Sequence, residues 1–286
     1  MTDPGAAIAL LDDGRIHVQH GPTDLIITID GTDEARRGAI QSVGELFGSL
    51  LADLMEDVEA LRSDVASNPR VSGVTAQRMV DATAAVAGSA FLTPMAAVAG
   101  AIADTVCEAI VRDGIDRAIV NNGGDIAFYL SEGASLKVGL ADVSTASPLG
   151  KFRIDSTLPI RGVATSGRGG RSLTMGIADS VAVVAPTCAV ADAAATLIAS
   201  AVDLPNSGLV TRVPANDMDA ASDLESRPVV IGVQPLTSAD ANLALQRGLT
   251  VAQRLISQRA IGAAALRLQQ HHATTDLSVP LLARDP

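Results

Sequence analysis

Aromatic side chains are scarce in this chain. Of its 286 residues, 2% are aromatic, with no Trp, one Tyr and four Phe. Proteins that bind single-stranded nucleic acid usually stack the bases on aromatic rings. Duplex binding needs clustered Lys and Arg to displace counterions, but here 32 acids outnumber 21 bases and the formal net charge is -11. The composition therefore argues against nucleic acid as a partner.

Cysteine is also rare. Cys107 and Cys188 both lie in apolar segments rich in Ala and Val, which predicts two small buried thiols rather than a disulfide or a metal pair. The start of the chain has no basic leader, and every long apolar stretch is interrupted by a charge or by Gly. We therefore expect no secretory signal, no membrane-spanning helix and a cytoplasmic protein.

Histidines are too few and too isolated to suggest a transition-metal site. They are His17, His20, His271 and His272. Neither pair has a Cys or Glu ligand set nearby, so we interpret all of them as surface residues. No Ser-His-Asp or Cys-His arrangement is apparent.

Hydrophobic residues still make up 48% of the chain, so the core must be built from Ala, Val, Leu and Ile. Apolar residues recur at helical spacing over residues 33–62, which predicts one long amphipathic helix. Further helices are expected at 75–87, 94–114, 187–204 and 239–258. Strands are expected at 15–20, 24–29, 117–122, 125–130, 136–141, 161–166, 173–185, 228–236 and 260–269.

These elements predict an α+β fold with mixed or antiparallel sheets packed with Ala-rich helices. Two such helices, each beside a β block, are compatible with an internally duplicated fold. We expect one domain over residues 1–275, with residues 276–286 as a loose tail.

The first segment with chemical potential is VNNGGDI, residues 120–126. A strand ends in Asn121 and Asn122, Gly123 and Gly124 follow, and Asp125 begins the next strand. Glycines here allow positive φ and let a ligand approach the backbone closely. The segment is also compatible with a tight β-turn in which Asn and Asp only satisfy the turn.

The second segment is GVATSGRGGRS, residues 162–172. Backbone N–H groups in a glycine-rich loop, together with arginine forks, suit phosphate or pyrophosphate. We expect an anion site here rather than a loop with solvated arginines, because bases are scarce elsewhere. Its residues are Thr165, Ser166, Arg168, Gly169, Gly170, Arg171 and Ser172.

The third segment is ADAAAT, residues 191–196. Asp192 and Thr196 lie four residues apart on a predicted apolar helix, so both project from one face. They could bind a hard cation such as Mg²⁺. Alternatively, Asp192 stabilises the helix start and Thr196 bonds back to a carbonyl, and the pair on its own favours this structural interpretation.

Taken together and in order, the segments resemble the ApbE-type family of FAD-dependent protein flavin transferases. The resemblance rests on Ala99, Gly100 and a later Asp104, on GGDI at 123–126, a VGL.D-like strand at 138–142, ATSG at 164–167, SVAVVAP at 180–186 and A-D-A…T at 191–196. It looks closest to a branch that carries HGPxDL (20–25), TPMAAVAGA (93–101), VNNGGDIA and GVATSGRGGRS. It implies an ApbE-like, T-fold-like architecture.

The resemblance also implies ligands. In that family the Asp and Thr of the late helix bind Mg²⁺ with a backbone carbonyl, which implies Asp192, Thr196 and Val98 here. FAD or FMN would lie against the GGDI turn and the ATSG strand. Candidate catalytic residues are Asp125, Thr165 and Ser166, and a homo-oligomer is left open.

The chain departs from the family at the segment after ATSG. The transferases carry a histidine there that is important for transfer, whereas residues 172–180 contain none. Their Asp at the start of the Ala-Gly helix is Thr93 here, and their Lys is Ala99. We therefore expect an anionic small-molecule ligand, phosphorylated or carboxylated, with flavin transfer absent or very weak. The alternatives are a hydrolase or lyase of a small cyclic or carboxylated metabolite, and a non-catalytic binding or assembly module.

Overall fold

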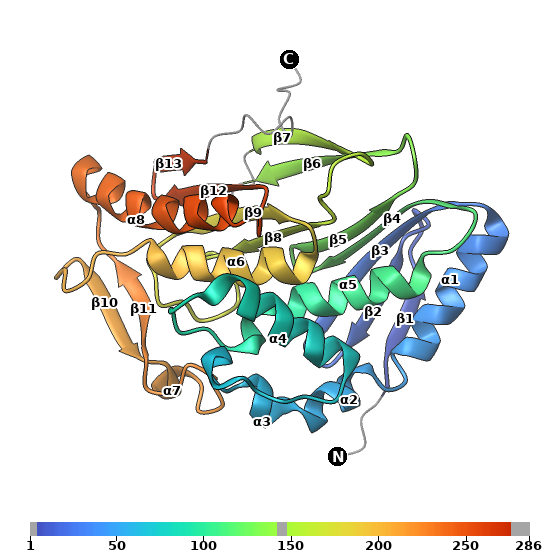
Figure 1. Cartoon of the computed structure of the whole chain (residues 1–286), viewed down its shortest axis with the longest axis horizontal. Helices are drawn as coiled ribbons and strands as arrows, with labels where there is room; N and C mark the ends of the chain where they lie inside the picture. The colour runs from blue at the N-terminus through green and yellow to red at the C-terminus, as the bar shows by residue number, and fades with distance from the viewer. Residues whose placement is uncertain (1–4, 142–147, 276–286) are drawn as a thin grey trace.

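The computed structural model describes residues 5–141 and 148–275. A nine-stranded sheet crosses the molecule in the order β1-β2-β3-β4-β5-β8-β9-β12-β13, and every neighbouring pair is antiparallel (Figure 1). Its strands are β1 Ala7–Leu10, β2 Ile16–His20, β3 Thr23–Gly31, β4 Ile115–Asn122, β5 Asp125–Leu130, β8 Gly162–Ser166, β9 Ser180–Ala185, β12 Ala263–Leu268 and β13 His271–Thr274. The α+β prediction is confirmed.

Helices cover one face of this sheet. In Figure 1, α5, α6 and α8 lie across that face, and α4 packs against α5 and α6. The α-helices are α1 Asp33–Leu46, α2 Leu50–Glu56, α3 Val58–Leu61, α4 Val74–Ala87, α5 Val98–Ile110, α6 Cys188–Ala201, α7 Ala215–Met218 and α8 Ser238–Ser257. Two 3₁₀ turns, η1 Val65–Ser67 and η2 Pro94–Ala97, precede α4 and α5. Within the described ranges, no helix is long and apolar enough for a membrane span.

Two hairpins lie outside the main sheet. One pairs β6 Ser135–Ala141 with β7 Pro148–Asp155, and the other pairs β10 Val210–Pro214 with β11 Pro228–Val233. Ile154 of β7 packs with Phe128, Val163 and Val184 in a second, smaller core, separate from the core under the helices. The β6–β7 hairpin therefore covers part of the sheet face opposite the helices, since strand side chains alternate between faces.

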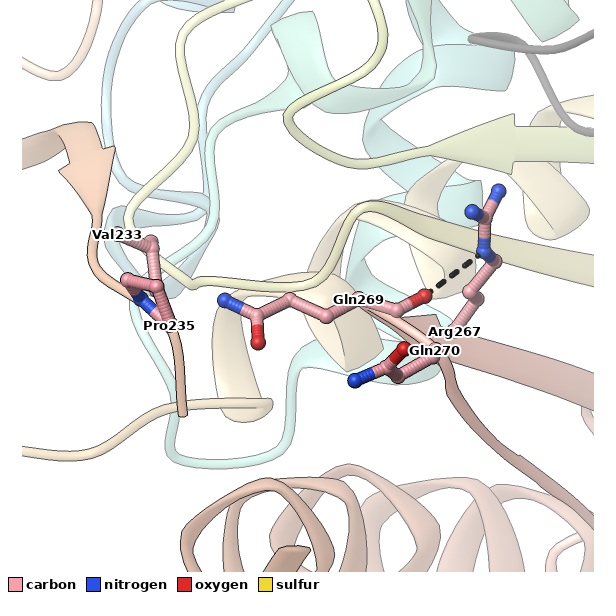
Figure 2. Close-up of a pocket in the computed structure, with 5 residues that line it drawn as sticks. All are labelled: Val233, Pro235, Arg267, Gln269 and Gln270. Carbon is pink, nitrogen blue, oxygen red and sulfur yellow. Dashed lines mark hydrogen bonds between the residues drawn. The ribbon is translucent and has the colours of Figure 1, made fainter. Parts of the chain in front are cut away.

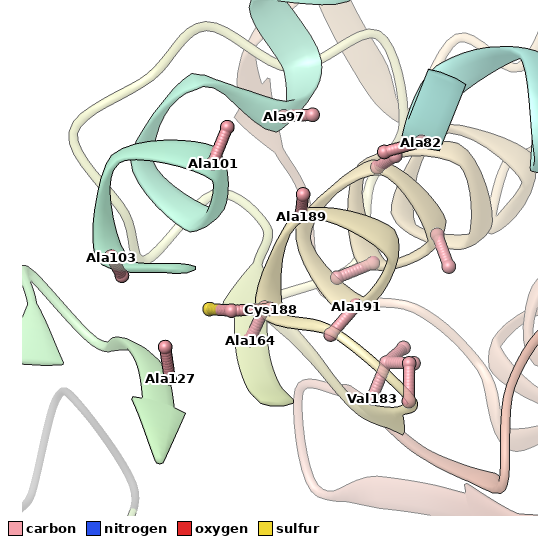
Figure 3. Close-up of a cluster of buried hydrophobic side chains, with 14 of the residues drawn as sticks. Ala82, Ala97, Ala101, Ala103, Ala127, Ala164, Val183, Cys188, Ala189 and Ala191 are labelled. Atoms are coloured by element: carbon pink, nitrogen blue, oxygen red, sulfur yellow. The ribbon is translucent and has the colours of Figure 1, made fainter. Parts of the chain in front are cut away.

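Alanines make the contact between α5, α6 and the sheet unusually close. Figure 3 shows Ala101 and Ala103 on α5, Ala189 and Ala191 on α6, and Ala127 and Ala164 on strands of the sheet, all buried. At Gly100 the two helices approach so closely that a Cβ would lie 2.5 Å from the Cys188 carbonyl oxygen. The prediction of an aromatic-poor core is confirmed, and so is that of two buried, free cysteines.

Three sequence-based expectations are wrong in detail. The single helix over 33–62 is broken into α1, α2 and α3, because the chain turns at Gly48, a poor helix former. The strand expected over 173–185 is β9 alone, because Gly176 lies against the end of α6, where a Cβ would be 2.0 Å from the Ala199 carbonyl oxygen. His20 is buried rather than on the surface, with its ring edge-on to Phe47 at 6.2 Å.

The division into one domain and a tail stays a prediction. Residues 276–286 lie outside the described residues, as does Asp142, the last position of the VGL.D-like strand.

Candidate functional site

The two central helices cap each other. Asp104 of α5 accepts hydrogen bonds from the backbone N–H groups of Cys188, at 3.0 Å, and Ala189, at 2.8 Å, in the first turn of α6. Asp192 of α6 accepts one from the N–H of Gly100, at 3.0 Å, in the first turn of α5. These amides have no partner within their own helices, so each carboxylate satisfies part of the other helix's start. The exchange fixes Asp192 beside the beginning of α5.

The β4–β5 turn supplies a second carboxylate. Gly123 and Gly124 have φ of 65° and 115°, a backbone region that other residues rarely adopt, so the turn requires glycine. Asp125 follows directly and begins β5, where its Oδ1 accepts the backbone N–H of Thr165 in β8 at 3.2 Å. The turn and the ATSG strand are therefore joined through Asp125.

The surroundings of these carboxylates favour their protonated forms. Burial raises the pKa of Asp125 to about 7, against the opposing effects of the Thr165 N–H and the Arg171 charge. Burial, followed by the charge of Asp125, raises the pKa of Asp192 well above its ordinary value, although the Gly100 amide opposes this. Each side chain keeps a small exposed part. Carboxylates with raised pKa values can retain a proton near neutral pH or attract a cation.

Other polar groups join them on the helix side of the sheet. Asn122 donates from Nδ2 to the carbonyl of Ala99, at 3.1 Å, one residue beyond Val98 at the start of α5. Thr196 Oγ1 donates to Ser166 Oγ at 3.3 Å. The structure thus brings all three sequence segments together.

Two predicted side chains face away from this group. Successive strand residues point to opposite faces, so Thr165 projects to the other side of the sheet from Ser166, and Asn121 from Asn122. Thr165 is exposed there, and Asn121 Oδ1 accepts the N–H of Gly124 at 2.9 Å. Asn121 is therefore part of the turn itself, and Thr165 contributes its backbone to the helix-side group.

Arg168 is held inside the glycine-rich loop. Its Nη2 lies 2.8 Å from Asp179 Oδ1, and Asp179 also accepts the backbone N–H of Gln269. Gly167, with φ of 139°, packs so closely on this segment that a Cβ would lie 2.6 Å from the Asp179 carbonyl oxygen. Arg168 and Asp179 thus tie the loop to the β12–β13 turn.

Arg171, unlike Arg168, is not held inside the glycine-rich loop. Its side chain is exposed and reaches over the β4–β5 turn, where Nη2 lies 2.6 Å from the position that a Cβ of Gly123 would occupy. Within the described part of the chain, Arg171 forms no ion pair. Gly169, Gly170 and Ser172 are exposed beside it. Of the two loop arginines, Arg171 is the one with a guanidinium available to an anion near Asp125.

Two cavities lie elsewhere. One, of about 460 Å³, is lined by Val233, Pro235, Arg267, Gln269 and Gln270 (Figure 2). The other, of about 480 Å³, lies between α4 and the start of α6. Neither is lined by a predicted site residue. The polar group described above lies apart from both of these cavities.

Sequence reasoning missed the capping role of Asp104. The sequence signal for this role is an acidic residue within an otherwise apolar run of a helix. In the structure that residue, Asp104 of α5, is only 6% exposed. A buried carboxylate needs hydrogen-bond donors, and the first turn of a neighbouring helix provides them.

The raised pKa of Asp125 makes stability depend on pH. The folded pKa of about 7 exceeds the unfolded value of 3.8, so the folded state loses stability as pH rises through this window, and the loss is complete above it. Asp125→Asn removes that loss and keeps an acceptor for the Thr165 amide. We expect the variant to be more stable than wild type at pH 8, on the order of 1 to 2 kcal/mol after allowance for the exposed part, and the gain to vanish near pH 4.

Urea unfolding at the two pH values measures this, with the exposed Glu132→Gln as the control. A gain that is equal at pH 4 and pH 8, or shared by the control, contradicts the assignment.

Comparison with known proteins identifies relatives of the chain. A family model described as AbpE bacteria matches residues 8–275. A UPF0280 protein of Methanosphaerula palustris is 37% identical over 180 residues, which cover 59% of this chain and 71% of that protein. Another, of Methanothrix thermoacetophila, is 44% identical over 110 residues, covering 38% and 46% respectively. The chain therefore spans about half to seven tenths of these relatives' lengths.

Solved structures share the fold. The apbe protein of Thermotoga maritima superposes with a TM-score of 0.52 at 10% identity, over 95% of this chain and 96% of that one. A histidine-to-glycine variant of the flavin transferase ApbE from Vibrio cholerae gives 0.50 at 12% identity, over 94% and 99%. The resemblance expected from the sequence motifs is confirmed: the chain belongs to the AbpE bacteria family and has the fold of the ApbE proteins.

Proposed function

We propose that this chain binds FAD, or a similar phosphorylated flavin, together with a divalent cation. The ligand lies at the helix side of the sheet, between the starts of α5 and α6 and the β4–β5 turn. The observation that carries the proposal is a pair of half-buried carboxylates, Asp125 and Asp192, which accept the Thr165 and Gly100 amides and have raised pKa values. Perturbed pKa values of this kind gather at functional sites. A protein of the same fold is named a flavin transferase.

The donor set fits Mg²⁺. The side-chain oxygens of Asp192, Thr196 and Asp125, with the carbonyl of Val98, are all hard ligands. Asp192 Oδ2 accepts the Gly100 amide, which holds the carboxylate at the start of α5. Within the described residues no cluster of three or more His, Cys, Asp or Glu could hold a metal. The set is therefore incomplete by itself, which suits Mg²⁺, since it usually retains waters and takes phosphate oxygens from a substrate.

A bound Mg²⁺ would neutralise charge on the ligand's phosphates. The chain's own residues supply the rest. Gly123 and Gly124 leave the turn without side chains, so phosphate oxygens can approach the backbone. Arg171 offers a guanidinium fork above the turn.

Asp125 can hold or release a proton near neutral pH, which is the property required of a general acid or base. Ser166 faces the same side and lies beside Thr196. The Thr165 hydroxyl faces away, so in this proposal its role is limited to orienting Asp125 through its amide.

Variants of Arg168 and Arg171 distinguish an effect on ligand binding from an effect on the stability of the fold. We expect Arg171→Ala to weaken FAD binding about tenfold or more, because a hydrogen bond to a charged group contributes roughly 1.5–3 kcal/mol. Arg168→Ala serves as the comparison, because it breaks the ion pair with Asp179. We expect this variant to have a lower melting temperature than Arg171→Ala and a smaller loss of FAD affinity.

Isothermal titration with FAD and Mg²⁺ gives the affinities, and thermal melts give the stabilities. Unchanged FAD affinity in Arg171→Ala would sink the anion-loop proposal.

Flavin transfer itself should be absent or very weak. Residues 172–180 contain no histidine, and their one carboxylate, Asp179, is engaged by Arg168 and Gln269. General acid–base assistance contributes about 10²–10⁴-fold, so its loss leaves FAD bound and barely turned over. Incubation with FAD, Mg²⁺ and an acceptor peptide, followed by mass spectrometry for covalent FMN, tests this. Robust flavinylation would falsify the reading of the missing histidine.

A further inference from the structure

Strand β1 is an edge of the nine-stranded sheet. Among residues 5–141 and 148–275 it pairs with β2 alone, and all four of its residues, AIAL, are exposed. Proteins usually protect such edges with charge, proline, a bulge or a covering segment. β1 contains no charge and no proline, and its register with β2 is regular. We propose that β1 pairs antiparallel with β1 of a second copy of this chain, joining the two sheets into one.

The helix side of this edge is apolar. Ile8 and Leu10 are 39% and 68% exposed, and on α1 Ile40 is 36% exposed. Ile8 Cδ1 lies 4.0 Å from the position that a Cβ of Gly44 would take, so α1 flanks the edge closely. Figure 1 shows β1 and α1 together at one end of the molecule. The unpaired backbone and the apolar strip thus form one continuous surface.

A second copy fits this surface better than an unrelated partner. In a two-fold pairing centred on Ala9, Ile8 of each copy lies opposite Leu10 of the other, on the same face, which is a favourable cross-strand pair. The charged residues after β1 do not oppose each other, because Asp12 and Asp13 fall opposite Ala6 and Gly5 of the second copy. In this register the edge pairs with itself without opposing like charges.

The pairing closes on itself, because each copy presents the same β1 edge to the other. A closed dimer of this kind leaves no free β1 edge on which further copies could add.

The test is the oligomeric state of the full chain over a concentration series, by sedimentation velocity. We expect a monomer–dimer equilibrium in the wild type. Leu10→Glu places like charges beside the axis and should raise the dimer dissociation constant by about tenfold or more. Leu243→Glu is the matched control, since Leu243 of α8 is similarly exposed, at 53%, and lies far along the chain from β1.

Hydrogen exchange provides a second measurement that needs no variant. The β1 amides of the wild type should become better protected as protein concentration rises, while those of α8 do not change. A wild type that stays monomeric at every concentration overturns the proposal. So does an equal loss of dimer in Leu10→Glu and Leu243→Glu, or β1 exchange that is independent of concentration.

Discussion

The exchange of caps between α5 and α6 is the interaction on which the rest of the site depends. Asp104 and Asp192 each hold the first turn of the other's helix, and the glycine at position 100 lets the helices approach closely enough for this. Burial raises the pKa of Asp104 to about 6, which still leaves it ionised at neutral pH, as a cap for two amides should be. Asp192 is consequently held at the start of α5.

The arrangement of Asp125 and Asp192 lowers the stability of the folded chain. Two carboxylates with raised pKa values destabilise the folded chain above neutral pH unless a proton or a cation lies with them. The Ala-rich helices pack closely, which gives dispersion contacts without loss of side-chain entropy. Residues that lower the stability of the fold in this way are typical of functional sites.

Much of this could be predicted from the sequence, where the signal was local. The turn at Gly123–Gly124, the Ala-rich helix after Thr187 and the α+β class follow from residue pattern alone. The opposite orientations of Thr165 and Ser166 also follow from strand alternation, although the motif suggested one joint site. The ion pair of Arg168 could not be foreseen, because its partner Asp179 is placed by contacts with the distant β12–β13 turn.

The central claim is that a divalent cation binds at Asp125 and Asp192 and displaces protons that their raised pKa values retain. It is tested by titrating Mg²⁺ into the FAD-saturated protein near pH 6.5, in buffers of different ionisation enthalpy. The dependence of the apparent heat on the buffer gives the number of protons released. The account predicts release of about one proton for each Mg²⁺ bound. Binding without proton release, or no Mg²⁺ binding at all, would contradict it.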